Sequence, residues 1–240
     1  MADLSQFQII KQGRKAWEHW RQQNPAVKID LSHADLEEAD LSVVDLKEAD
    51  LSGVDLTGAS LEGSLLLGAV FRGATLRGAN FSESELNNAD FRSADLRGAY
   101  FIQATLDKAV FTEANLEGAD LSEADLTEAN FHAALLSHAN FNATMLLLTD
   151  LSDADLREAD LSDAHLVGVN LQGANLSNAN LSRANFSGIG LRSPAIPDPA
   201  LTNLRGAIFT GADLSRADLR GVDLTGVDLS SAILDGTIFD

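Results

Sequence analysis

A large apolar residue occurs at every fifth position over most of this chain. From Leu31 to Leu191 every fifth residue is Leu or Phe, which makes 33 such centres without an exception. A small residue, most often Ala, stands two positions before each centre, as in the stretch ADLSEADLTEANF at 119–131. The same rule resumes at Leu204 and continues to Phe239, so the repeat accounts for most of the sequence.

No regular secondary structure has a period of five. On an α-helix a step of five residues turns the chain by about 500°, so Leu121, Leu126 and Phe131 would scatter around the axis. On a flat strand an odd period would move Ala119 and Ala124 to opposite faces. The pattern fits only a chain that turns a corner after each short extended stretch and presents one small and one large side chain to a common interior. The sequence therefore predicts a solenoid.

The glycines support this interpretation independently. Of the 18 glycines, 16 lie two residues after a centre, and Gly53, Gly58 and Gly118 are examples. That position would be the second central residue of a type II turn, where a positive φ is required. Proline is absent from both repeat tracts, as expected where a strand ladder needs every backbone N–H.

The phenylalanines indicate how many sides each coil has. Phe71, Phe81, Phe91, Phe101 and Phe111 occur at every second centre, with Leu centres between them. A four-sided coil, with one repeat on each side, would stack these rings on two opposite walls, whereas a three-sided coil would distribute them over all walls. The spacing favours four sides.

The repeat A(D/N)LXX resembles the motif of the pentapeptide-repeat protein family, over about residues 29–190 and 202–240. This resemblance implies an all-β solenoid, a right-handed quadrilateral β-helix with four pentapeptides per coil. The number of repeats would make about ten coils, and at about 4.8 Å per coil the rod would be about 50 Å long.

Residues 1–28 do not follow the five-residue repeat. Leu4, Phe7, Ile10, Trp17 and Trp20 have near-helical spacing, so we expect one amphipathic helix over residues 3–23. Such a helix would cover the open first coil and act as an N-terminal cap, and Trp-bearing caps of this kind are similar to those of cyanobacterial family members. Its basic residues keep a membrane-binding or partner-binding helix open as an alternative.

The second departure from the repeat is a proline-rich segment at 193–203, between repeat tracts at 29–192 and 204–240. The interval between the centres at Leu191 and Leu204 is not a multiple of five, which one repeat plus an eight-residue bulge would explain. The segment is then a tolerated surface loop or a recognition loop on a rigid scaffold, and the C-terminal tract could also form a separate short stack. The residues that a recognition loop would present are Pro194, Ile196, Pro197, Asp198 and Pro199.

No helical segment follows the last centre, Phe239, so the last coil would show an open edge. We therefore expect that a homodimer could form through this uncapped C-terminal end.

Composition limits the functional classes. The chain has 240 residues and no cysteine, which excludes thiolate metal sites. Its formal net charge of −19 disfavours direct binding to nucleic acid or to an anionic membrane. The N-terminal residues lack the apolar run of a signal peptide and no stretch approaches 18 apolar residues, so we expect a cytoplasmic protein without a membrane span.

The expected interior leaves no room for substrate or cofactor, because Leu, Phe and Ala would fill it. We therefore expect no catalytic, cofactor-binding or metal-binding residues. The outward histidines at 33, 132, 138 and 165 are dispersed, and the neighbouring carboxylates lack the cleft that acid–base catalysis needs.

Function is expected on the outer surface, which carries three features. Asp or Asn before a centre, as at Asp35, Asp40, Asp120, Asp125 and Asn130, suits hydrogen bonds to nearby backbone. Other carboxylates are expected to be free surface charge: Glu113, Glu117, Glu123, Glu128, Asp153, Glu158 and Asp163. An apolar group is expected to be exposed and to contact a partner: Met145, Leu147, Leu148 and Val167 on one wall and Leu135 on another.

Two functional hypotheses follow. The first is a non-catalytic scaffold that presents its walls to a protein partner. The second comes from the resemblance, because some family members mimic DNA, bind DNA gyrase or topoisomerase IV, and inhibit the enzyme or protect it. The acidic rod suits such mimicry, but a local positive cluster interrupts it at Arg72, Arg77, Arg92 and Arg97. Binding by mimicry should weaken steeply with salt, and binding through apolar side chains should not.

Overall fold

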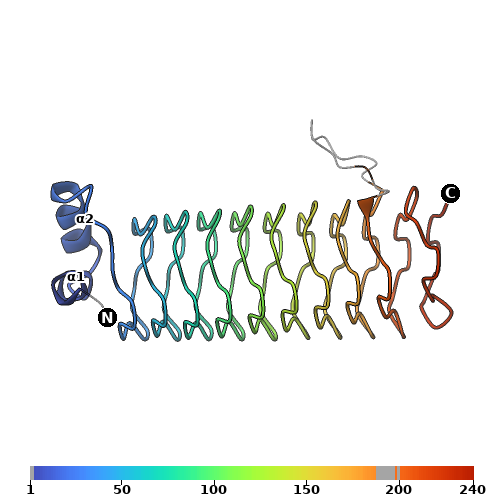
Figure 1. Ribbon diagram of the computed structural model, residues 1–240, viewed down its shortest axis with the longest axis horizontal. Helices are drawn as coiled ribbons and strands as arrows, with labels where there is room; N and C mark the ends of the chain where they lie inside the picture. Colours follow the sequence, from blue (N-terminus) through green and yellow to red (C-terminus); the bar gives the residue numbers. More distant parts are fainter. Residues whose placement is uncertain (1–2, 188–197, 199–200) are drawn as a thin grey trace.

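The computed structural model describes residues 3–187, 198 and 201–240. It shows a rod of stacked coils with two short helices at one end (Figure 1). Successive coils pair in parallel, beginning with Asp30 and Asp50 and reaching His165 and Asn185, and the partners are four repeats apart along the chain. Four pentapeptides therefore make one coil, as the phenylalanine spacing predicted. The fold is the expected right-handed quadrilateral β-helix.

Each coil has four walls, which we name by the residue that comes first on each. Wall A begins at Asp30, wall B at Asp35, wall C at Asp40 and wall D at Asp45. Walls A and C are opposite, as are walls B and D. At four centres per coil, the centres from Leu31 to Phe186 and from Leu204 to Phe239 make about ten coils.

The corners between walls are β-turns. In the first of them the N–H of Ala34 donates to the carbonyl of Leu31 over 3.1 Å, and His33 between them has a φ of 58°. Positive φ at this second central residue recurs from repeat to repeat, at glycines such as Gly58 and also at other residues, among them the β-branched Val43. The turn therefore explains the glycine position, and the fold imposes the same backbone where glycine is missing.

Aromatic and aliphatic side chains fill the interior of the rod. The rings of Phe71 and Phe91 on wall A stack with centroids 4.8 Å apart. Phe81, on the opposite wall, meets both of them edge-on at 5.6 and 5.9 Å. The centres and the small residues before them are almost all buried, so the coil encloses a packed core.

The N-terminal cap is made of two helices, α1 (Leu4–Ile10) and α2 (Arg14–Gln23). The expectation of one continuous helix over residues 3–23 was wrong. Gly13 precedes α2 with a φ of 90°, a conformation outside the helical region, and it separates the two helices.

Side chains of the cap bind the open edge of the first coil. The side-chain oxygen of Gln6 accepts from the N–H of Asp30 at 2.9 Å, and its amide nitrogen donates to the carbonyl of Lys28 at 3.1 Å. Trp17 is fully buried, and its Nε1–H donates to the carbonyl of Asp45 at 3.0 Å. The cap therefore covers the apolar end of the rod and also satisfies backbone groups there.

The C-terminal tract continues the same stack. Asn203 pairs with Asn170, 33 residues earlier, whereas in the uninterrupted coils Asn140 pairs with Asp120, 20 residues earlier. The additional chain is therefore an insertion, and Leu204 takes the place that directly follows Phe186. The alternative that residues 204–240 form a separate stack was therefore wrong. The expectation that one repeat between Leu191 and Leu204 pairs within the stack was also wrong.

The last coil is less regular than the others. On walls C and D it forms β-bridges with the preceding coil, Asp213 with Ile233 and Asp218 with Ile238. No β-bridge is found for the described residues of walls A and B, where the N–H of Gly211 donates to the carbonyl of Ser231 at 3.2 Å. Neither helix of the described chain is long and apolar enough to cross a membrane.

Candidate functional site

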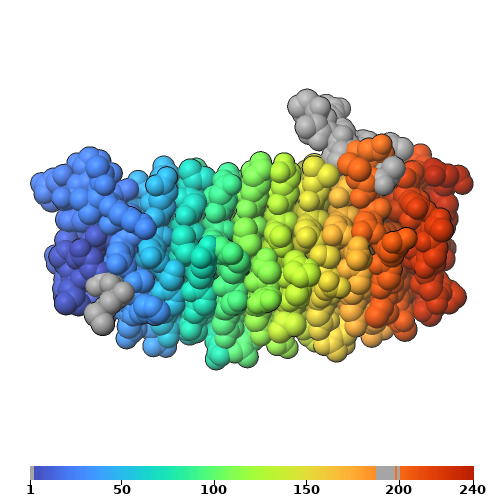
Figure 2. Space-filling model, in the orientation of Figure 1, coloured from blue at the N-terminus to red at the C-terminus, as the bar shows by residue number. Residues whose placement is uncertain are grey.

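The outer surface consists of three residues from each repeat: the one before the centre and the two after it. On the face shown in Figure 2, the side chains of successive coils lie in closely packed rows across the rod. Since the interior is filled by residues such as Leu121 and Phe131, any binding site on the coils must be made from these outward positions.

The carboxylate or amide before each centre has a structural role, as expected. Oδ1 of Asp125 accepts from the N–H of Thr127 at 3.1 Å and also from its hydroxyl at 2.6 Å. The same backbone bond, from the residue two positions later, is made to Asp35, Asp40, Asp120 and Asn130. Asn serves as well as Asp in this bond, so the fold does not require the negative charge at these positions.

The predicted acidic surface includes one carboxylate on each wall of a single coil. Glu113, Glu117, Glu123 and Glu128 lie on walls A, B, C and D of the coil at 109–128, and all four are exposed. Glu123 accepts from the Nε2 of Gln103 at 2.7 Å. Glu128 lies 3.6 Å from the Nζ of Lys108, so it is not free, contrary to expectation. Together the four residues form an acidic belt around the middle of the rod.

The second acidic group is only partly free. Asp153 and Glu158 are exposed, but Asp163 is half-buried and is held by the guanidinium of Arg183 at 2.7 and 2.5 Å. These hydrogen bonds hold the pKa of Asp163 below its usual range. The expectation that Asp163 is free surface charge was wrong, because Arg183 occupies the corresponding position on the next coil.

The apolar residues around Met145 do not form one exposed patch. Val167 is fully buried and Leu147 is 7% exposed, so neither side chain is free, contrary to expectation. Leu148 and Leu135 are exposed but lie on opposite walls, D and B. The N–H of the residue after Val167 donates to the hydroxyl of Thr202 at 3.0 Å. The chain that re-enters the stack at Thr202 therefore lies against this corner.

The predicted recognition loop falls almost entirely outside the described residues. Pro194, Ile196, Pro197 and Pro199 lie outside them, and of the five predicted residues only Asp198 is described. The carbonyl of Asp198 accepts from the N–H of Leu201 at 2.9 Å.

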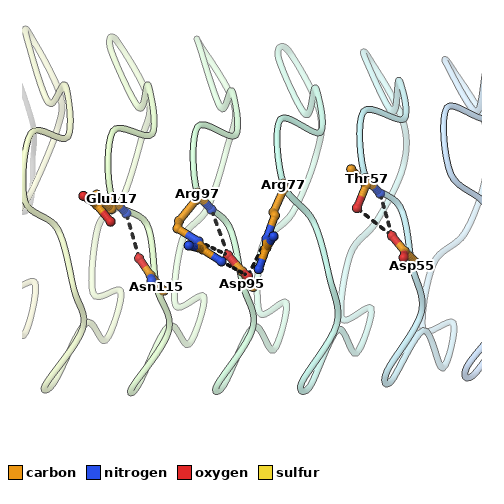
Figure 3. Close-up of polar contacts among 7 residues, drawn as sticks. All are labelled: Asp55, Thr57, Arg77, Asp95, Arg97, Asn115 and Glu117. Carbon is orange, nitrogen blue, oxygen red and sulfur yellow. Dashed lines mark hydrogen bonds and ion pairs between the residues drawn. The ribbon is translucent and has the colours of Figure 1, made fainter.

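Four arginines on two adjoining walls form a cluster that we call the arginine cluster: Arg72 and Arg92 on wall A, and Arg77 and Arg97 on wall B. The Nε of Arg77 donates to Oδ2 of Asp95 at 2.7 Å, and Arg97 binds the same carboxylate through Nε at 2.9 Å and Nη2 at 2.8 Å. Figure 3 shows the two guanidinium groups on either side of Asp95.

Wall A repeats this arrangement one corner away. Arg72 donates through Nε to Asp90 at 2.6 Å, and Arg92 binds Asp90 through Nε and Nη2 at 2.9 and 2.7 Å. The four arginines were identified from the sequence, but their sharing of two carboxylates was not predicted. The spacing could have shown it. A residue one position after a centre lies beside the residue one position before the centre on the same wall of the next coil, which is 18 residues later in the chain.

The electrostatic consequence is clearest at Asp95. The hydrogen bonds from Arg97, and then those from Arg77, hold the pKa of Asp95 well below its usual range, although partial burial opposes the effect. In return, the hydrogen bond to Asp95 raises the pKa of Arg97. Asp95 and Arg97 are therefore fully charged at neutral pH.

The geometry offers no metal centre in the part of the chain that the structure describes, where no three His, Cys, Asp or Glu side chains come together to hold an ion. The Nδ1 of His165 is buried without a hydrogen-bond partner, and burial lowers the pKa of this imidazole. A half-buried, neutral ring of this kind fits the packing of wall D better than a catalytic role.

The sequence profile described as pentapeptide repeats matches this chain in eight copies, which together cover residues 28–188 and 201–239. No curated protein sequence matches the chain closely enough to count as a relative.

Solved structures give the same result at the level of the fold. The chain resembles the crystal structure of HetL, a pentapeptide repeat protein involved in heterocyst differentiation regulation from the cyanobacterium Nostoc sp. strain PCC 7120. The two are 29% identical, with a TM-score of 0.60 and 92% of each chain covered. It is also similar to a pentapeptide repeat protein from the Arabidopsis thaliana thylakoid lumen, with 32% identity, a TM-score of 0.23, and coverage of 60% of this chain and 67% of that one. QnrB1, a plasmid-mediated fluoroquinolone resistance protein, is 17% identical with a TM-score of 0.45, and the match covers 78% of this chain and 89% of that one.

Proposed function

This chain belongs to the pentapeptide-repeat family, and from that premise we propose that it is a non-catalytic protein whose outer walls bind a protein partner. The observation that carries the proposal is the packed interior. Phe71, Phe81 and Phe91 contact one another across the coil, so no substrate can enter it.

The outer walls suit binding better than catalysis. Their titratable groups are mostly exposed, and their hydrogen bonds hold carboxylates such as Asp95 and Asp218 in the ionised form. A general acid or base needs a pKa near the working pH, and hydrogen bonding moves the pKa of Asp95 and of Asp218 further from it. A rigid rod with four different faces instead offers a partner an extended and preorganised surface.

A photo-cross-linking scan tests this proposal. A photoreactive residue is placed at one exposed turn position on each wall: Ser93 on wall A, His138 on wall B, Gln103 on wall C and Asn88 on wall D. In extract from the cells that produce the protein, we expect one discrete cross-linked protein from one wall or two adjoining walls. Equal and diffuse labelling from all four walls, or none, would contradict partner binding.

A second candidate function, DNA mimicry directed at gyrase or topoisomerase IV, is supported by the acidic belt at Glu113, Glu117, Glu123 and Glu128. B-DNA carries one charge per about 1.7 Å, and a mimic must approach that density along at least one face. The arginine cluster, directly beside the belt, lowers it. Inhibition of gyrase supercoiling near stoichiometric protein, fading at high salt, would favour mimicry over the first proposal. No effect at large excess would exclude it.

Three finer proposals concern other surfaces. Leu135 and Leu148 remain proposed contact residues, each on its own wall, and the loop that includes Asp198 remains a proposed recognition element.

The last coil exposes Leu234 and Phe239, which suits end-to-end contact with a second copy. Light scattering should then show a dimer that Phe239→Glu dissociates, and a monomer at high concentration would count against this contact.

A further inference from the structure

The arginine cluster carries more positive charge than its own carboxylates neutralise. Two guanidinium groups share Asp90 on wall A and two share Asp95 on wall B, so four positive charges meet two negative ones. The other ion-paired arginines on the described coils each have a carboxylate of their own. Arg157 binds Asp155 with the same bidentate geometry that Arg97 has with Asp95, and Arg220 binds Asp218 in the same way.

The excess has a simple origin in the repeat. In the coil at 69–88 the positions before the centres on walls A and B are Val70 and Thr75, which have no carboxylate. Arg72 and Arg77 therefore lack a partner two residues earlier and reach across to the next coil, 18 residues on. There each of them meets a carboxylate that already binds an arginine.

This arrangement fixes the guanidinium groups and leaves donors unused. Arg72 and Arg77 each use Nε on the shared carboxylate, and Arg92 and Arg97 use Nε and Nη2. Between 41% and 55% of each arginine side chain is exposed. The remaining N–H groups make no hydrogen bond within the described chain, and the two coils that carry them are about 4.8 Å apart along the rod. Held in place by Asp90 and Asp95, they need little further ordering to bind an anion.

The surroundings of the cluster limit the length of that anion. On the same two walls it is bounded by Asp50 and Asp55 in the preceding coil and by Glu113 and Glu117 in the following coil. The positive surface is therefore only two coils, or about 10 Å, long. A nucleic acid strand would run onto the flanking carboxylates and be repelled, whereas a short acidic stretch of protein fits between them.

An exposed aromatic ring adjoins the cluster. Tyr100, the only tyrosine of the chain, is 47% exposed on wall C, three residues after Arg97. Ile102 lies beside it on the same wall and is half-buried. Tyrosine and arginine are the residue types that contribute most to protein–protein contacts, and a nucleic acid or a free anion would not need the apolar neighbour.

We infer that the arginine cluster, with Tyr100 at its edge, is the docking site for a short acidic segment of a protein partner, whose carboxylates bind the outward N–H groups of the two arginine pairs. This inference rests on the proposed function, because it names the wall and the chemistry through which a partner is bound.

The test is direct binding of a fluorescein-labelled tetraglutamate peptide, followed by fluorescence anisotropy at low and at physiological salt. Three proteins are compared: the full chain, the Arg77→Gln/Arg97→Gln variant, and the control variant Arg157→Gln/Arg183→Gln. Both variants lose two positive charges and two exposed arginines, and circular dichroism confirms that each is folded. Tetraglutamine serves as the uncharged probe.

We expect tetraglutamate to bind the full chain and the control variant equally, and to bind the Arg77→Gln/Arg97→Gln variant at least tenfold more weakly. Tetraglutamine should not bind. An Arg77→Lys/Arg97→Lys variant should also bind more weakly than the full chain, because lysine keeps the charge but loses the fixed fork.

Three results would overturn the inference: no binding of tetraglutamate to the full chain at millimolar concentration, equal loss in the control variant, or tighter binding of a four-nucleotide DNA strand than of tetraglutamate. The cross-linking scan separates this failure from failure of the proposed function. A partner still captured by the Arg77→Gln/Arg97→Gln variant leaves partner binding intact and removes only the assignment to this cluster.

Discussion

Arg77 donates through its Nε to Oδ2 of Asp95 across 2.7 Å, although 18 residues separate the two along the chain. The contact exists because four pentapeptides complete one coil. Arg77, one position after its centre, therefore lies beside Asp95, one position before the centre on the same wall of the next coil (Figure 3). The proposed function depends on such contacts between coils, since each wall is assembled from residues that are distant in sequence.

The interior should tolerate a small loss of volume far better than truncation to a methyl group. Phe101 is fully buried, stacks on Phe81 with centroids 5.0 Å apart and meets Phe91 and Phe111 edge-on. We expect Phe101→Ala to lower the free energy of unfolding by about 3–5 kcal/mol, measured by urea denaturation. Phe101→Leu should cost less than about 1.5 kcal/mol, because Leu121 occupies the next place in the same column. Equal losses from both variants would show that the column is not packed as described.

Turns that lack glycine carry backbone strain that glycine would relieve, and Val43 lies in one of them. Val43 is β-branched and has a φ of 58°, a conformation that costs non-glycine residues roughly 1–2 kcal/mol. We expect Val43→Gly to raise the free energy of unfolding by about 0.5–1 kcal/mol, after the entropy of the added glycine is subtracted. The reverse change, Gly78→Ala, should destabilise by a similar amount, since an added Cβ meets nothing within 4 Å there and only the backbone is strained. A destabilising Val43→Gly would contradict this.

The residue before a centre should need an acceptor but not a charge. Asp125 accepts from the N–H and the hydroxyl of Thr127. We expect Asp125→Asn to leave the thermal midpoint nearly unchanged and Asp125→Ala to cost about 1 kcal/mol, because an N–H then loses its partner. The comparison of the two melting curves is the measurement. A loss in Asp125→Asn as large as in Asp125→Ala would mean that charge, and not the hydrogen bond, is what matters.

Acid should weaken the C-terminal coils through Asp218. The hydrogen bonds from Arg220, at 3.0 and 2.6 Å, lower the pKa of Asp218 from 3.8 to about 2. Since the folded state favours the ionised form, this stabilisation is present above about pH 4 and is lost as the pH falls toward about 2. NMR titration of the Asp218 carboxyl carbon should show a pKa near 2 that returns toward 3.8 in Arg220→Gln. The distant change Arg157→Gln should leave it unaltered, and a parent value near 3.8 would refute the pairing.

The sequence by itself determined the architecture of the coils. A five-residue period with a small and a large apolar residue leaves only a chain that turns after each repeat, and glycines such as Gly58 mark where the turn needs positive φ. The spacing of Phe71 and Phe81 predicted four walls. These features are local and periodic. Every repeat carries the same pattern, so an exception at a single position does not change the predicted architecture.

Only the tertiary structure decided which residues share a site. It put Leu204 directly after Phe186 in the stack and enclosed Val167, which the repeat alone places outside. It also brought Arg77 and Arg97 to one carboxylate. The physical reason is the same in each case. Burial and charge pairing on a wall depend on what the neighbouring coils and the inserted chain place beside a residue, and the five-residue repeat carries no information about which side chains stand there.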